Sequence, residues 1–223
     1  MSRILKIGAG LIVLVGLLLL GLRLSTAGDI SSEQLLLKLS DLPAGSHVQI
    51  RGPLIPGSPA NGFVNKDGSD IVKGYMDGER VDFMAPLAKI EGAPPERSTS
   101  EAYIAHLVYR FSSERAAANE FQRLVAMFRS ERGVVTSQTS DSSSKQSVVF
   151  VGEDDEMPGA THRLFFMQRG KFLLVLYSPG PMQNSALQAA QSYGYLLTQT
   201  DLDNINHAKE TLFAANVSRL QSR

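Results

Sequence analysis

An uncharged apolar run near the start of the chain constrains the whole molecule more than any other feature. The run covers Ile7 to Leu22, with basic residues on both sides of it. A helix over residues 4–24, at about 1.5 Å per residue, reaches roughly the thickness of a bilayer's hydrocarbon layer. The apolar core of a signal peptide is shorter, about 7 to 15 residues. The length therefore predicts a transmembrane anchor that contacts the lipid bilayer through residues 4–24.

The segment after the run leaves open whether the anchor is kept. Small residues at positions 25–27 suit a signal peptidase, so cleavage after Ala27 is the alternative to retention. Orientation follows from Arg3 and Lys6, which with the terminal amine outnumber the single Arg23 on the other side. This bias predicts a single-pass protein of the cell membrane with its N-terminus in the cytoplasm.

The organisation that follows is a signal-anchor with a short linker over 1–28 and an extracytoplasmic domain over 29–223. The chain has 22 basic and 22 acidic residues, and this balance argues against a nucleic-acid partner. It has no cysteine, so neither a disulfide nor a lipidated thiol is available. Nothing in the composition calls for a cofactor.

The first half of the domain carries weak structural signals. A short helix is expected from Ser31 or Ser32 to a point before Pro43, followed by one strand around 46–50. Prolines and glycines predict an irregular stretch over 51–62. One or two strands are expected within 70–90.

The second half begins at a loop over 91–100, which is a possible internal boundary, and then becomes clearer. The stretch from Tyr103 to Phe111 alternates in a strand pattern, with Ile104, His106, Val108 and Arg110 on the face opposite Tyr103. From Ser112 the apolar spacing becomes helical, and Gly133 ends the helix. Further strands are expected at 134–139, 147–151, 161–168 and 172–177, and helices at 185–198 and 202–220. This order predicts the α+β class: a mainly antiparallel sheet packed with helices as an α/β sandwich.

Three stretches, FSSERAAANEFQRL, VGEDDE and LFFMQRGKFLLVLY, follow one another in an order that resembles tethered extracytoplasmic domains of bacteria. The resemblance is to the sensor domains of mycobacterial receptor kinases and related lipoproteins, and it covers roughly Leu35 to Leu197. It implies a ligand-sensing or accessory role. The chain departs from that family in lacking a lipidated cysteine and the disulfide cysteines of the kinase sensors.

Two acidic stretches are candidate sites for a hard cation such as calcium, which needs several oxygen ligands. The first contains Asn65, Asp67, Ser69 and Asp70, but lacks the glycine and glutamate of an EF-hand loop. The second is preferred and contains Glu153, Asp154, Asp155 and Glu156. Its alternative interpretation is a solvated hairpin end.

Catalytic patterns are few. Ser142 and Lys145 match S-x-x-K, the serine and lysine of penicillin-binding enzymes, but lie in a serine-rich loop without the companion motifs. The four histidines are His47, His106, His162 and His207. His106 and His162 are candidates for a shared site, with the ordinary packed histidine as the alternative.

The last helix, within 201–223, offers two further hypotheses. Asp203, His207 and Glu210 share one face at a spacing that suits zinc, but equally form the polar face of an amphipathic helix. The apolar face either packs on its own domain or docks on a partner. The candidate partner-binding residues are Ile205, Leu212, Phe213, Val217 and Leu220.

The function that these patterns favour is a membrane-anchored binding module without catalysis, as an accessory subunit or sensor beside another membrane protein. The alternative is an exported hydrolase with a histidine and carboxylate site. A deep pocket that gathers a histidine with a carboxylate favours the enzyme, and a shallow apolar surface favours the binding module.

Overall fold

The computed structural model describes residues 30–54, 72–90, 99–130, 134–142, 145–153, 159–192, 194 and 196–223. The chain divides into two compact units, Met1–Ser31 and Ser32–Arg223, and the sheet and every helix named below belong to the second. The predicted anchor over 4–24 lies outside the described residues. Among the residues that are described, no helix combines the length and the apolarity that crossing a membrane requires.

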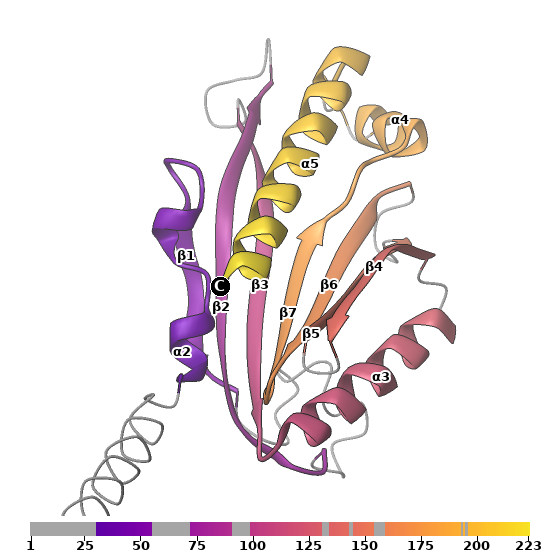
Figure 1. Cartoon of the computed structure of the whole chain (residues 1–223). Coiled ribbons are helices and arrows are strands. Elements are labelled where there is room, and N and C mark those ends of the chain that lie inside the picture. Colours follow the sequence, from indigo (N-terminus) through magenta and orange to yellow (C-terminus); the bar gives the residue numbers. More distant parts are fainter. Residues whose placement is uncertain are drawn as a thin grey trace, which may run out of the picture. The chain divides into compact units, whose positions relative to one another are not determined.

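One sheet of seven strands organises the second unit (Figure 1). The strands are β1 (His47–Pro53), β2 (Tyr75–Lys89), β3 (Thr99–Phe111), β4 (Val134–Ser142), β5 (Lys145–Glu153), β6 (Thr161–Arg169) and β7 (Phe172–Pro179). Their order is β1-β2-β3-β7-β6-β5-β4, and every neighbouring pair is antiparallel. The predicted α+β class with an antiparallel sheet is confirmed. After β3 the chain crosses to the far edge at β4 and returns strand by strand to β7, which pairs with β3.

Strand β3 contributes buried side chains to both faces of the sheet, because successive side chains of a strand point to opposite sides. Tyr109 and Phe111 belong to one buried cluster, and Ile104 and Val108 belong to the other. The alternation that the sequence shows from Tyr103 onward therefore corresponds to two separate apolar layers.

Helix α3 (Glu114–Ser130) covers the first face. The hydroxyl of Ser113 accepts a hydrogen bond from the backbone N–H of Ala116 at 3.2 Å, as expected of a helix cap. Phe121 and Leu124 are fully buried against β3, β6 and β7. The helix carries the chain from β3 in the middle of the sheet to β4 at its edge.

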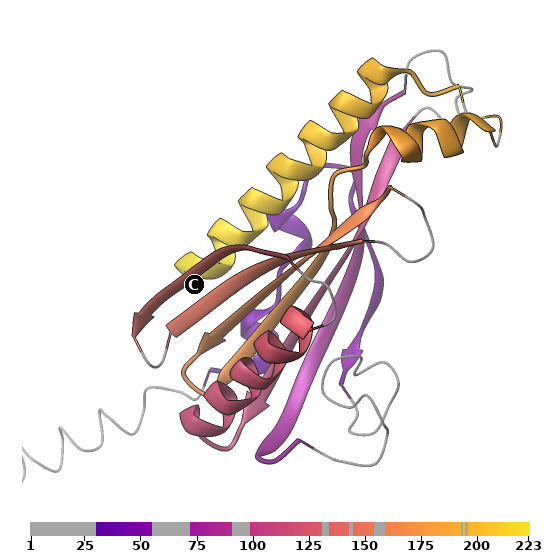
Figure 2. The ribbon, with the colours of Figure 1, turned by 90° about the vertical axis from the view of Figure 1, so that its right-hand side faces the viewer.

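The opposite face is covered by α2 (Ser32–Leu35), the 3-10 turn η1 (Leu39–Asp41) and the long α5 (Gln199–Ser222). Figure 2 shows α3 and α5 on opposite sides of the sheet. Leu36, Phe83, Leu176 and Leu212 are among the residues buried in this layer. The single short helix expected before Pro43 is thus two shorter elements.

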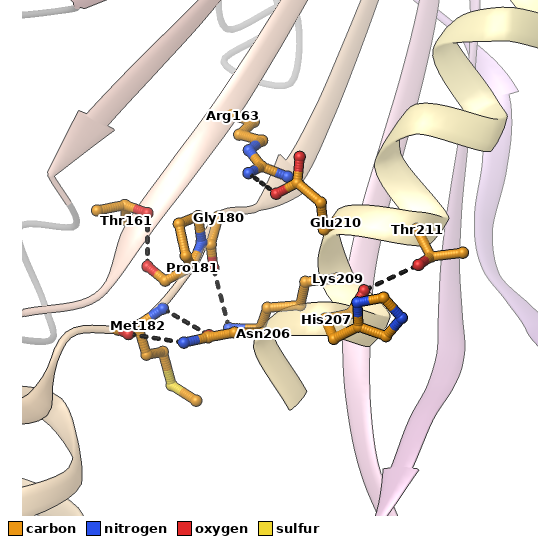
Figure 3. Close-up of polar contacts among 10 residues, drawn as sticks. All are labelled: Thr161, Arg163, Gly180, Pro181, Met182, Asn206, His207, Lys209, Glu210 and Thr211. Atoms are coloured by element: carbon orange, nitrogen blue, oxygen red, sulfur yellow. Dashed lines mark hydrogen bonds and ion pairs between the residues drawn. The ribbon is translucent and has the colours of Figure 1, made fainter. Parts of the chain in front are cut away.

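Helix α5 is fixed at its N-terminal half to the segment that follows β7 (Figure 3). The side-chain amide of Asn206 accepts from the N–H of Met182 at 2.8 Å and donates to its carbonyl at 2.9 Å. Lys209 Nζ donates to the carbonyl of Gly180 at 3.1 Å. Glu210 pairs with Arg163 of β6. The helix therefore has a defined rotation about its axis, which decides which side chains it presents.

The remaining elements differ from their predictions in detail. One strand, β2, lies within the described part of 70–90, which agrees with the one or two strands expected there. It pairs with β3, so the possible boundary at 91–100 lies between two neighbouring strands of the same sheet. Residues 91–98 are outside the described residues. Helix α4 (Asn184–Ser192) ends earlier than the expected 198, and Gly194, just beyond it, has the left-handed φ of 83° that is typical of a helix end. Thr198 instead caps α5 by accepting from the N–H of Asp201 at 3.1 Å.

Candidate functional site

A groove of about 490 Å³ runs between α5 and two facing segments, 41–43 and 86–87. Its size is within the range of roughly 300 to 1,000 Å³ that is usual for small-molecule sites. Its apolar lining consists of Leu42, Pro43, Pro86, Leu87, Ala208, Leu212 and Ala215. The polar lining consists of Asp41, His207, Thr211 and Arg219. The lining is therefore mixed, with polar groups exposed beside apolar side chains, and such a mixture can both hold and orient a ligand.

The α5 side of the groove is a single stripe of the helix. His207, Thr211, Ala215 and Arg219 follow one another at intervals of four residues, so each side chain neighbours the next in a row that turns by about 40° around the helix axis at every step. His207 and Arg219 are exposed and lie roughly 18 Å apart along the axis, from a rise of about 1.5 Å per residue. The hydroxyl of Thr211 donates to the backbone carbonyl of His207 at 3.0 Å. The groove is therefore elongated, with a basic or polar side chain towards each end.

The facing wall is held by Arg223. Its guanidinium donates to the carbonyl of Leu36 at 2.6 Å and to the carboxylate of Asp41 at 2.5 Å. Burial raises the pKa of Asp41, but the N–H of Lys38 and the guanidinium groups of Arg223 and Arg219 outweigh this effect, so the pKa lies below its ordinary value. Asp41 is an ionised carboxylate whose charge is already offset by Arg223.

His106 supports the same wall from below. Its Nδ1 accepts the N–H of Leu37 at 3.0 Å. The side chain is fully buried, and Nε2 has no hydrogen-bond partner among the described residues. Burial, together with the positive charge of Arg223, lowers the pKa of His106 to about 3, although Asp41 acts in the opposite direction. His106 is a neutral residue that fixes the main chain ahead of η1.

His106 and His162 do not form a shared site. His106 lies on the α5 face of the sheet, as Ile104 and Val108 do. His162 is at alternate positions with Leu164 and Phe166 on β6, so it lies with them on the α3 face. His162 stacks on Tyr177, with ring centroids 5.8 Å apart. A Cβ placed on Gly152 would lie only 2.6 Å from His162 Nε2, so the imidazole also rests on that glycine. The packed-histidine alternative describes His162, and His47 is an exposed residue at the start of β1.

The zinc hypothesis for α5 is not supported by the positions of its three residues. Glu210 turns to Arg163 on β6 and away from His207 (Figure 3). Asp203 accepts from Gln199 at 3.0 Å, and His207 lines the groove. Of the preferred acidic stretch only Glu153 is described, as an exposed residue at the end of β5. Asp154, Asp155 and Glu156, like the stretch from Asn65 to Asp70, lie outside the described residues. Within the described part of the chain, no group of three or more histidine or acidic side chains is placed to hold a metal ion.

Ser142 and Lys145 do not have the geometry of the S-x-x-K motif. That motif needs a serine at the start of a helix with the lysine one turn later, whereas Ser142 ends β4, Lys145 begins β5, and the two are paired across the ladder. Lys145 Nζ donates to the carbonyl of Gln221 at 3.1 Å. This lysine attaches the end of α5 to the sheet.

The apolar side chains proposed for partner binding lie inside their own domain. Leu212, Phe213 and Leu220 are buried in the layer between α5 and the sheet, Val217 packs against it, and Ile205 is also buried. The guanidinium of Arg163 covers the ring of Phe213, 5.1 Å from its centroid. Of the two alternatives for this face, packing on the domain describes this structure.

A second polar cluster, which sequence reasoning missed, lies on the α3 face. The carboxylate of Asp82 is fully buried and accepts from Arg80 Nε and Nη2, both at 2.7 Å, and from the hydroxyl of Tyr103 at 2.5 Å. The hydrogen bond to Asp82 raises the pKa of Arg80, and burial raises that of Tyr103. The signal in the sequence is Arg80 and Asp82 two residues apart, which places both on one face of a strand.

Comparison with known proteins adds a resemblance of fold. No family model matches the sequence, and no curated protein matches it. Among solved structures, the extracellular domain of PknH from Mycobacterium tuberculosis is similar with a TM-score of 0.44 and 13% sequence identity, over 80% of this chain and 97% of that one. The expected similarity to receptor-kinase sensor domains is therefore present only as a weak resemblance at the level of the fold.

Proposed function

We propose that this chain is a membrane-anchored, extracytoplasmic binding module that uses the groove along α5 to hold a ligand, as an accessory subunit or sensor beside another membrane protein. The observation that carries the proposal is the groove itself, which is lined by apolar side chains and by polar side chains of α5 and of the facing wall. The apolar run Ile7 to Leu22 supports the anchor, and the basic residues before it support a cytoplasmic N-terminus.

Binding is favoured over hydrolysis by the state of the groove's polar groups. His207 and Asp41 both line it, and a histidine with a carboxylate is the pair that the hydrolase alternative would use. However, Asp41 accepts from Lys38 N–H at 2.7 Å and from Arg223, so its carboxylate is engaged elsewhere than in orienting an imidazole. The hydroxyl of Thr211 is bonded to a carbonyl of its own helix. Asp41 and Thr211 therefore contribute to the shape and the charge of the groove, as in a binding surface.

A membrane anchor would make such a groove effective even with modest affinity. Tethering confines the module and any membrane-bound ligand or partner to one surface, which raises their effective concentration. The groove then has only to discriminate among molecules that are already nearby.

The test is to purify the full-length protein from its own membranes and identify by mass spectrometry the small molecules that are extracted with it. Ala208→Leu adds bulk to the groove lining at a helical position, and Ala214→Leu is the matched control because Ala214 is exposed on α5 and does not line the groove. We expect one species on the wild type and on Ala214→Leu that is depleted on Ala208→Leu. Identical extracts from all three proteins would contradict a groove ligand.

A further inference from the structure

The groove that carries the proposed function also has features that select a class of ligand. Its facing wall contains Pro43 and Pro86, which have no backbone N–H to donate. An extended peptide brings an N–H and a carbonyl with every residue, and these need partners when they are buried. The leucine, alanine and proline side chains of the lining cannot satisfy them, and the four polar lining side chains are too few to pair with every main-chain group of a peptide. An apolar chain without main-chain polar groups suits this floor better than a peptide does.

The charge of the groove is unbalanced in one direction. Among the described residues that line the groove, Asp41 is the one that is acidic. It pairs with Arg223 and also interacts with Arg219, so these three side chains together carry one net positive charge. Arg219 is an exposed lining residue whose guanidinium reaches a neutral group, the side-chain carbonyl of Asn216, at 3.5 Å. A net positive charge therefore remains at the Arg219 end of the groove, and an anion is its natural complement.

We propose that the groove binds a single-chain amphiphile with an anionic head, whose head group meets Arg219 and whose apolar chain lies along Ala215, Leu212 and Ala208. The inference rests on the proposed function, since it names the ligand class of the same groove. Carboxylate and phosphate heads share the chemistry that Arg219 recognises. The roughly 18 Å between Arg219 and His207 accommodates a chain rather than a compact head group alone.

The experiment uses the full-length protein in phosphatidylcholine nanodiscs and a dodecanoate probe with a photoreactive group at its apolar end. After irradiation, peptide mapping locates the attached label, and dodecyl phosphate, dodecanol and inorganic phosphate are added as competitors. Because the photoreactive group is at the apolar end, we expect label within 207–212 and 84–90, and label at 215–219 would contradict the proposed orientation. Dodecyl phosphate should displace the probe, and neither dodecanol nor inorganic phosphate should displace it at equal concentration. Displacement by inorganic phosphate alone would assign the site to a free anion and overturn the amphiphile.

Two pairs of variants separate the apolar and the charged parts of the site. Ala208→Leu, and Ala215→Leu as a second blocking variant, should each lower labelling at least about tenfold, while Ala214→Leu leaves it unchanged. Arg219→Gln should weaken probe binding by about tenfold, the size of one charge-assisted hydrogen bond. Arg115→Gln, an exposed arginine on α3, is its control.

The outcomes distinguish the two proposals. If the blocking variants abolish labelling but Arg219→Gln does not weaken it and dodecanol competes as well as dodecyl phosphate, the anionic head group is wrong and the binding groove stands. If label falls outside the groove, or if Ala208→Leu and Ala215→Leu label like the wild type while remaining folded by circular dichroism, both proposals fail.

Discussion

Acidification should destabilise the folded domain through one buried side chain, that of His106. The imidazole is fully buried in β3, with Nδ1 bonded to the N–H of Leu37 and with the guanidinium of Arg223 nearby. Burial and this neighbouring positive charge lower its pKa from 6.5 to about 3. The folded domain therefore keeps His106 neutral at pH values where the unfolded chain protonates it.

The size of the effect follows from this difference in pKa. Above pH 6.5 neither state is protonated at His106, and stability is complete; between pH 6.5 and about 3 the unfolded chain binds a proton that the folded chain does not. The free energy of unfolding then falls by about 1.4 kcal/mol for each pH unit. At pH 5 the loss due to His106 is about 2 kcal/mol.

The assay is urea unfolding of residues 29–223 at pH 7 and pH 5, followed by far-UV circular dichroism, for the wild type and His106→Asn. Asparagine removes the titrating group and places an acceptor oxygen near the position of Nδ1, so the bond from Leu37 has a partner in the variant. The wild type should lose about 2 kcal/mol more than the variant between the two pH values. Equal losses would refute the assignment of the acid sensitivity to His106.

Three further predictions concern the core, the buried carboxylate and the anchor. Phe121→Ala and Leu124→Ala should each lower the free energy of unfolding by about 2 to 5 kcal/mol because both side chains are fully buried, and nearly silent changes in denaturant unfolding would contradict the packing of α3. Asp82→Asn should lower the free energy of unfolding by about 2 kcal/mol, because it leaves Arg80 and Tyr103 without their carboxylate, while the partial exposure of Arg80 limits the loss. A loss no larger than that caused by the same change at an exposed carboxylate, measured in parallel, would argue against the cluster. Full-length protein should stay in carbonate-washed membranes with its domain open to external protease, and a soluble mature protein that begins near Gly28 would rule out the anchor.

The elements with strong periodicity could be predicted from the sequence. In β3 the alternation of apolar residues was complete enough to give the strand, and the change to helical spacing at Ser112 gave α3. These patterns arise because one or two faces of the element are buried, so that apolar residues recur at the period of the strand or helix along its whole length. The boundary of α4 was harder, because the capping of α5 by Thr198 ended the apparent helical pattern early.

The groove could not be predicted because it is assembled from three distant parts of the chain. Its walls come from 41–43, 86–87 and one stripe of α5, and only the fold brings them together. Asp203, His207 and Glu210 share a helix face in the sequence, but the rotation of α5 turns Glu210 to Arg163 and leaves His207 in the groove. A sequence pattern predicts which residues share a face of a helix, but it does not predict which other parts of the chain that face contacts.

The central claim, that the groove along α5 holds a ligand, is tested most directly by hydrogen–deuterium exchange. The full-length protein purified from its own membranes is compared with the same protein after its bound small molecules have been extracted and the protein returned to phosphatidylcholine nanodiscs. The account predicts faster exchange after extraction within 207–219 and 84–90, with no change across β4 and β5, which contribute no residue to the groove. Unchanged exchange in those segments, or a change confined to another part of the domain, would contradict it.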